Sequence, residues 1–336
     1  MAEHEPIEIE DRIAVDRAIC AARTQLDRWR HASWIDPSSA AHRNPWLTHR
    51  AIAGKTTYDA LDKVDAGAHE KLLFEAFRAH VRHLTIARVA FEADLELARS
   101  VNDPAGIVRL ETERQISWRQ AIEGVVSAPA GHASAYLDAL AECAPRVASA
   151  AHARRERRQE AAKRLGETDV DARFTPGAGF AEVGARALLD ATEDLTIDVL
   201  KRELIREDRS PEDPRPEDVV GIAVARSAAS GWPSRMRARW LEEVFGAHLH
   251  GLSLDIELPR FVAGASSFAR ALEAFGFALG RAAARASPIF SLADDPYASS
   301  AHAVGAVFGS LAHSGVFQRR GLGLGAPDAE KNRRSL

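Results

Sequence analysis

Apolar side chains recur at helical spacing along most of the chain, and this pattern predicts an all-α fold. The first helix is expected from about Glu8 to His31, where five apolar residues follow at three- and four-residue steps: Val15, Ile19, Ala22, Leu26 and Trp29. We expect this helix to end before Asp36-Pro37. Residues 34–56, which contain two prolines, are predicted to be an irregular segment whose Trp34 and Trp46 dock on helices. The alternative is that exposed tryptophans in this loop mark a binding surface.

The longest periodic segment runs from Ala68 to Val101, and its apolar residues form one seam: Leu73, Phe77, Val81, Leu84, Phe91, Leu95 and Ala98. Arg88 takes a seam position, and His80 and His83 flank the same region. A charge on a buried seam needs a partner or a ligand. Arg88 therefore either forms a structural ion pair or directs its guanidinium at a carboxylate or phosphate. These three residues are candidate ligand-binding residues.

Three further features complete the predicted architecture. After a break at Asn102-Asp103-Pro104 we expect a helix over 106–126, and then a second helix over 132–165 that Pro145 bends or splits. The run from Leu252 to Phe261 is the one strand-like stretch. The domain organisation expected from these elements is an N-terminal helical half at 1–165, a linker at 166–180, a C-terminal helical half at 181–325 and a polar tail at 326–336.

The C-terminal half is predicted to form a bundle-like helical hairpin between Gly264 and Leu324. Each of its two helices carries a ridge of small residues that includes two glycines: Gly276 and Gly280, then Gly305 and Gly309. Glycine inside a helix costs roughly 1 kcal/mol relative to alanine, so close packing or a ligand must offset the cost. His302 and His313 lie on the face of the second ridge. They are candidates for flanking a flat ligand, and helix packing is the other use of that face.

Composition narrows the function classes. The net charge of -4 does not favour a nucleic-acid-binding surface, and two cysteines do not support a disulfide scaffold or a cysteine-rich zinc module. The basic run Arg154 to Arg158 is interpreted as a solvated helix face, with polyanion contact as the alternative. No apolar run of about 20 residues and no secretory signal is present, so we expect a cytoplasmic protein without a membrane span.

A metal centre has weak candidates only. His248 and His250 stand two residues apart, with Glu243, Asp255 and Glu257 nearby, and on an extended chain the two imidazoles would point to one side. Glu243 and His248 are five residues apart, which is a poor helical pairing. We expect ordinary half-buried histidines here, with no bound metal and no cofactor.

One short stretch has a family resemblance. Glu273–Leu279 resembles the zinc helix of the oligoendopeptidase and thimet-oligopeptidase peptidases, which reads His-Glu-Phe-Gly-His-Ala-Leu; the matching residues are Phe275, Gly276, Ala278 and Leu279. Glu273 and Phe277 stand at the histidine positions, and Ala274 stands at the catalytic glutamate. The resemblance implies a degenerate, zinc-free relative whose cleft binds peptides, and it carries over no catalytic role.

The sequence thus predicts a non-catalytic helical binding or assembly protein with a protein or peptide partner. Its apolar helical surfaces also allow a homo-oligomer. The alternative is an enzyme or pseudo-enzyme with a pocket between helices, near Arg88 and the C-terminal hairpin. A nucleic-acid partner is not expected.

Overall fold

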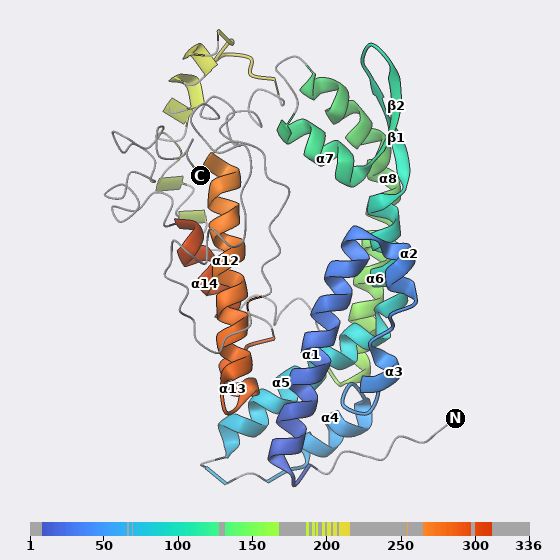
Figure 1. The fold of residues 1–336 in the computed structure, drawn as a ribbon, viewed down its shortest axis with the longest axis vertical. Helices are drawn as coiled ribbons and strands as arrows, with labels where there is room; N and C mark the ends of the chain where they lie inside the picture. The colour runs from blue at the N-terminus through green and yellow to red at the C-terminus, as the bar shows by residue number, and fades with distance from the viewer. Residues whose placement is uncertain are drawn as a thin grey trace. The chain divides into compact units, whose positions relative to one another are not determined.

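The computed structural model describes residues 9–65, 67, 68, 70–127, 132–167, parts of 186–215, 254, 265–296 and 300–310. This part of the chain is predominantly helical, with one small antiparallel sheet (Figure 1), which confirms the expected fold class. None of the described helices is both long and apolar enough to cross a membrane. The elements are α1 (Arg12–Ile35), α2 (Pro37–Ala41), α3 (Trp46–His49), α4 (Lys55–Asp62), α5 (Lys71–Val89), α6 (Phe91–Asn102), β1 (Pro104–Arg109), β2 (Glu113–Ser117), α7 (Trp118–Ser127), α8 (Ala133–Arg164), α12 (Ala265–Ala286), α13 (Phe290–Ala293) and α14 (Ser300–Ser310).

Helix α1 follows its apolar pattern closely. All five residues of the predicted stripe are buried, and the Asp11 carboxylate accepts a hydrogen bond from the Ala14 amide at the start of the helix. Asp36 ends α1 and begins α2, because its carboxylate accepts hydrogen bonds from the Ser38 and Ser39 amides while Pro37 takes the first helical position. The predicted stop at Asp36-Pro37 is therefore confirmed.

The stretch expected to be irregular is instead built from short helices. Helices α2 and α3 and the start of α4 fall within residues 34–56, so that prediction was wrong. Trp46 is buried as expected, whereas Trp34 is 50% exposed. The anchor of this region on α1 is Trp29, whose indole nitrogen donates to the Ala40 carbonyl at 3.1 Å.

The long seam is divided between α5 and α6, which meet at Ala90. Except for Leu73, which is half-buried, the predicted seam residues are buried. Helix α6 ends at Asn102, as the following Asp103-Pro104 predicts. Helix α8 runs through Pro145 and ends at Arg164.

The helix predicted over 106–126 was wrong, because residues 104–117 form the β1–β2 hairpin and only the remainder is helical. Gly106 and Val108 are buried and the residues between and after them are not, which is the two-residue period of a strand. Val108 and Ile116 pack with Ala121 and Ala139 in one apolar cluster. A Cβ on Gly106 would lie 2.3 Å from the Ala139 carbonyl oxygen, so only glycine permits this approach of β1 to α8.

The chain divides into two compact units. The first contains residues 1–124, 130–176 and 287–297, and the second contains 125–129, 177–286 and 298–336. The division differs from the expected one in a single large respect. Residues 287–297, which join α12 to α14 along the chain, belong to the N-terminal unit rather than to the C-terminal half.

In the second unit, α12 and α14 pack against each other through their glycine positions. A Cβ on Gly276 would lie 2.6 Å from the Phe308 Cβ, and one on Gly305 would lie 3.0 Å from the Glu273 carbonyl oxygen. The rings of Phe275 and Phe308 lie beside this contact with centroids 5.4 Å apart. Close helix packing therefore accounts for these two glycines.

Candidate functional site

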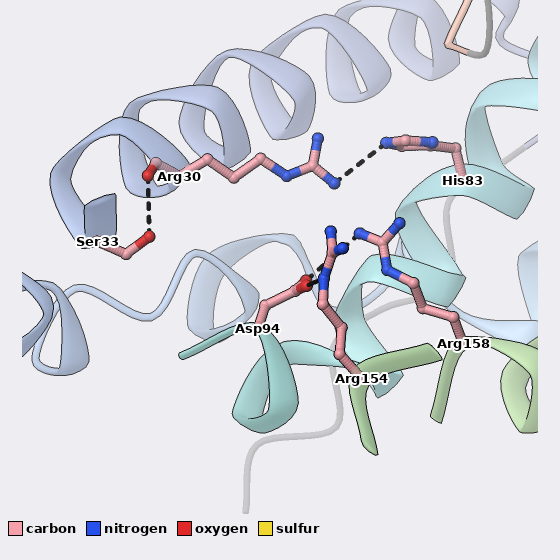
Figure 2. A network of polar contacts seen from close by, with 6 residues as sticks. All are labelled: Arg30, Ser33, His83, Asp94, Arg154 and Arg158. Atoms are coloured by element: carbon pink, nitrogen blue, oxygen red, sulfur yellow. Dashed lines mark hydrogen bonds and ion pairs between the residues drawn. The ribbon is translucent and has the colours of Figure 1, made fainter. Parts of the chain in front are cut away.

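Polar side chains from four helices meet inside the N-terminal unit, which is the first of the two units. Figure 2 shows this arginine centre, which we define as Arg30 of α1, His83 of α5, Asp94 of α6, and Arg154 and Arg158 of α8. Arg154 and Arg158 are four residues apart, so both project from one face of α8. Asp94 lies in the first turn of α6, where the helix dipole favours a carboxylate.

Asp94 is the carboxylate around which the two arginines of α8 gather. Arg154 binds its Oδ1 through Nε, and Nη2 of Arg158 lies 3.6 Å from Oδ2. Arg158 and Asp94 are 14% and 9% exposed, whereas Arg154 is 36% exposed and marks the solvent-facing edge. The basic run of α8 is therefore only partly a solvated surface, because two of its arginines turn inward.

Arg30 is the unusual member of the centre. Its side chain makes one polar contact within the described residues, from Nη2 to Nε2 of His83 at 3.5 Å, and no carboxylate of this part of the chain forms an ion pair with it. Burial, and next the positive charge of Arg158, lower the pKa of Arg30 to about 9. The guanidinium thus stays charged at neutral pH, although desolvation and the neighbouring arginines outweigh the favourable charge of Asp94.

His83 is neutral in this setting. Burial lowers its pKa well below the usual 6.5, and the charges of Arg23, Arg30 and Arg158 act in the same direction. A neutral ring can accept the hydrogen bond from Arg30 at Nε2. The centre therefore has three guanidiniums and one bound carboxylate, and the imidazole adds no positive charge.

A second polar cluster, nearer the start of α1, holds residues 287–296, which we call the docked segment. The Asp16 carboxylate accepts hydrogen bonds from the Phe290 and Ser291 amides, both at 2.9 Å, at the start of α13. Arg23 pairs with Asp294 at the other end of α13. Asp16 and Arg23 are two helical turns apart on α1, so one face of α1 holds both ends of the short helix.

His80 of α5 completes this second cluster. It is fully buried, lies 2.7 Å through Nε2 from the Asp294 carbonyl oxygen, and packs beside the Phe290 ring with centroids 5.6 Å apart. Donation to a carbonyl places the proton on Nε2. Burial, and then the charge of Arg23, lower the pKa of His80 to about 4, so it is neutral near pH 7.

The structure places the predicted site residues in different surroundings. His80 and His83 are both buried on α5 and belong to the two clusters. Arg88 is half-buried and donates from Nε to the Ala53 carbonyl oxygen at 2.6 Å; among the described residues no acidic partner binds it, contrary to the ion-pair expectation. The buried arginine of α5 is Arg82, which is 2.7 Å from Glu167. Three of the other candidates lie outside the described residues: His248, His250 and His313. The backbone of His302 is described, but its side chain is not.

Sequence reasoning missed the charged residues of α1, although a signal was present. Asp16, Arg23 and Arg30 are each seven residues apart, and seven residues are almost two complete turns of an α-helix. The three therefore lie on one face, beside the apolar stripe of Val15 and Ile19. Charges repeated every seven residues along the edge of a buried stripe indicate a polar helix interface. Their partners Asp94 and Asp294 have no such signal.

Comparisons with protein-family models, curated proteins and solved structures find no match for this chain. In the described part of the chain, no group of three or more His, Cys, Asp or Glu residues has an arrangement able to hold a metal ion.

Proposed function

We propose that this chain is a non-catalytic binding protein that recognises an anionic group of a protein or peptide partner at the arginine centre. Arg30, Arg154 and Arg158 are the residues that would bind this group. An arginine fork matches the two oxygens of a carboxylate or a phosphate, and buried arginines bind such groups through charge-assisted hydrogen bonds.

The observation that carries the proposal is the state of Arg30. Arg30 is half-buried, and desolvation is the largest cause of its lowered pKa. A desolvated cation without a bound anion is costly, and proteins normally provide a paired carboxylate or a ligand. Here the side chain contacts neutral His83, and the charge of Arg158 disfavours the Arg30 cation by more than the charge of Asp94 favours it. An anion placed between Arg30 and the arginines of α8 would offset both effects. The 36% exposure of Arg154 supports access from solvent at that edge.

The enzyme or pseudo-enzyme alternative has less support from the same contacts. Both buried histidines of α5 have low pKa values and hold structural contacts, so neither is poised as a general base near neutral pH. The peptidase-like stretch lies in α12, where Gly276 packs against Phe308. That contact supports a packing role for the glycine of the motif.

The test is calorimetric titration with pyrophosphate, citrate and acetate at constant ionic strength. Arg30→Gln removes the unpaired cation, and Arg157→Gln is the matched control because Arg157 is exposed and pairs with Glu160 at 3.0 Å. We expect pyrophosphate or citrate to bind the wild type and the control, with binding at least about tenfold weaker in Arg30→Gln, since a charge-assisted contact contributes about 1.5–3 kcal/mol. Equal affinity in all three proteins, or no binding of any anion to the wild type, would refute the proposal. The relative strength of pyrophosphate and citrate distinguishes phosphate from carboxylate recognition.

A further inference from the structure

The docked segment is held to α1 by hydrogen bonds to Asp16 and an ion pair with Arg23, and to α5 by a hydrogen bond with His80. Phe290, Ser291 and Asp294 are almost fully buried, although more than 200 residues separate them from their partners. The segment covers Arg23 and His80, and the Asp16 carboxylate holds its helix start. It therefore occupies a built polar site on the N-terminal unit.

The Arg23–Asp294 ion pair at this site leaves some of its buried polar atoms without hydrogen bonds to the described residues. Nη2 of Arg23 reaches Oδ2 of Asp294 at 3.2 Å, whereas Arg23 Nε and Asp294 Oδ1 are buried without a hydrogen-bond partner in the described part of the chain. A buried pair that leaves such atoms unsatisfied is weaker than one with every donor and acceptor paired. Arg23 thus has capacity for a second or a different anion.

Arg23 also connects the two clusters electrostatically. It lies two helical turns before Arg30 on the same face of α1, a rise of about 10 Å. Its charge lowers the pKa of His80, His83 and Arg30, which shows that its field reaches both clusters. Whether Asp294 is docked on Arg23 therefore changes the potential at the arginine centre.

We propose that the docked segment regulates the arginine centre: its Asp294 neutralises Arg23 and lowers the affinity of the centre for anions, so segment docking and anion binding oppose each other. This inference rests on the proposed function, because it concerns the same anion site. With the segment docked, Asp294 offsets the positive charge beside Arg30. With the segment released, Arg23 adds a fourth positive side chain to those of Arg30, Arg154 and Arg158.

Thermodynamic reciprocity gives the proposal a second consequence. If docking weakens anion binding by some factor, then anion binding must weaken docking by the same factor. An anion at the arginine centre should therefore loosen the hydrogen bonds that the Phe290 and Ser291 amides donate to Asp16. The protein then has two opposing states, one with the segment docked and one with the anion bound.

The test compares pyrophosphate binding to the wild type and to Asp294→Asn, by calorimetry at constant ionic strength. Asp295→Asn is the matched control, since Asp295 is the exposed neighbour and its substitution removes the same charge without opening the Arg23 pair. We expect Asp294→Asn to bind pyrophosphate about tenfold more tightly than the wild type, within the usual range of coupling between sites. The control should match the wild type within about twofold, as expected for an exposed charge that is screened by solvent.

Hydrogen exchange of the wild type gives a measurement that needs no variant of the segment. The Phe290 and Ser291 amides should exchange faster as pyrophosphate saturates the protein, and they should not respond in Arg30→Gln. Equal or weaker affinity in Asp294→Asn, or unchanged exchange at saturation, would overturn the inference. If the wild type binds pyrophosphate through Arg30 and Asp294→Asn binds it equally, only the regulatory inference fails. If neither protein binds, the proposed function fails with it.

Discussion

Arg23 and Asp294 are 271 positions apart in the chain, yet they form an ion pair in which the two side chains are only 4% and 2% exposed. Burying both charges costs several kcal/mol in desolvation, and their mutual attraction roughly compensates. The pair therefore contributes more to the specificity of docking than to net stability. The segment that carries Asp294 can dock on α1 only at a position where a cation, here Arg23, pairs with the buried carboxylate.

Removing one member of this pair should be costly. Arg23→Met leaves the Asp294 carboxylate buried and unpaired, and we expect a loss of about 3–5 kcal/mol in the free energy of unfolding of the N-terminal unit, measured by urea denaturation. The double variant Arg23→Met with Asp294→Leu should recover a large part of that loss. A single variant as stable as the wild type would show that the pair is not formed in solution.

Acid should destabilise the N-terminal unit through His80. Its pKa is about 4 in the folded protein and 6.5 in an unfolded chain, so the unfolded state binds the proton more strongly. The stabilisation is complete above pH 6.5 and is lost as the pH falls from 6.5 to about 4. The difference between the two pKa values corresponds to about 3 kcal/mol in the free energy of unfolding. Unfolding measured at several pH values should show this slope, and His80→Gln should remove most of it, leaving the contribution of His83, whose pKa is also lowered.

The two helices of the second unit allow a matched pair of glycine substitutions. Gly276→Ala should destabilise by about 1–3 kcal/mol, because the new methyl group would meet the Phe308 Cβ at 2.6 Å and the Val304 carbonyl oxygen at 2.8 Å. Gly309→Ala meets its nearest atom at an ordinary 3.4 Å and should be neutral or stabilising by up to about 1 kcal/mol, since alanine favours the helix. Melting temperatures that move in the same direction for both variants would contradict this packing.

The β1–β2 hairpin depends on a glycine for a different reason. Gly106→Ala would place a methyl group 2.3 Å from the Ala139 carbonyl oxygen, and backbone cannot move aside as a side chain can. We expect a loss of about 1–3 kcal/mol in stability, with hydrogen exchange rising in the strands. Gly67→Ala is the control, because nothing lies within 4 Å of its Cβ position. Equal melting temperatures for the two variants would count against the contact with α8.

The hydrophobic pattern of the sequence correctly predicted the burial of residues that need only water on one side and an apolar core on the other. The stripe of α1 and the seam of α5 and α6 could be predicted because any apolar interior accepts them. The hairpin could not, since Ile107, Leu110 and Trp118 also fit a helical period, and the decisive contact is Gly106 on the backbone of α8. Arg88 looked like the buried charge of α5, but Arg82 is the fully buried arginine, and Arg88 is half-buried and donates to the Ala53 carbonyl.

The sequence by itself determined the buried stripe of α1 and the seam of α5 and α6, the end of α1 at Asp36 and the end of α6 before Pro104, because periodicity, caps and proline act within a few residues. Only the tertiary structure decided which charges meet. Asp16, Arg23 and Arg30 share a face of α1 by their spacing, but Asp94 and Asp294 come from distant positions with no pattern of their own. Buried electrostatic interactions depend on distance and desolvation in space. The arginine centre and the docking of residues 287–296 therefore become visible only when the helices are packed together.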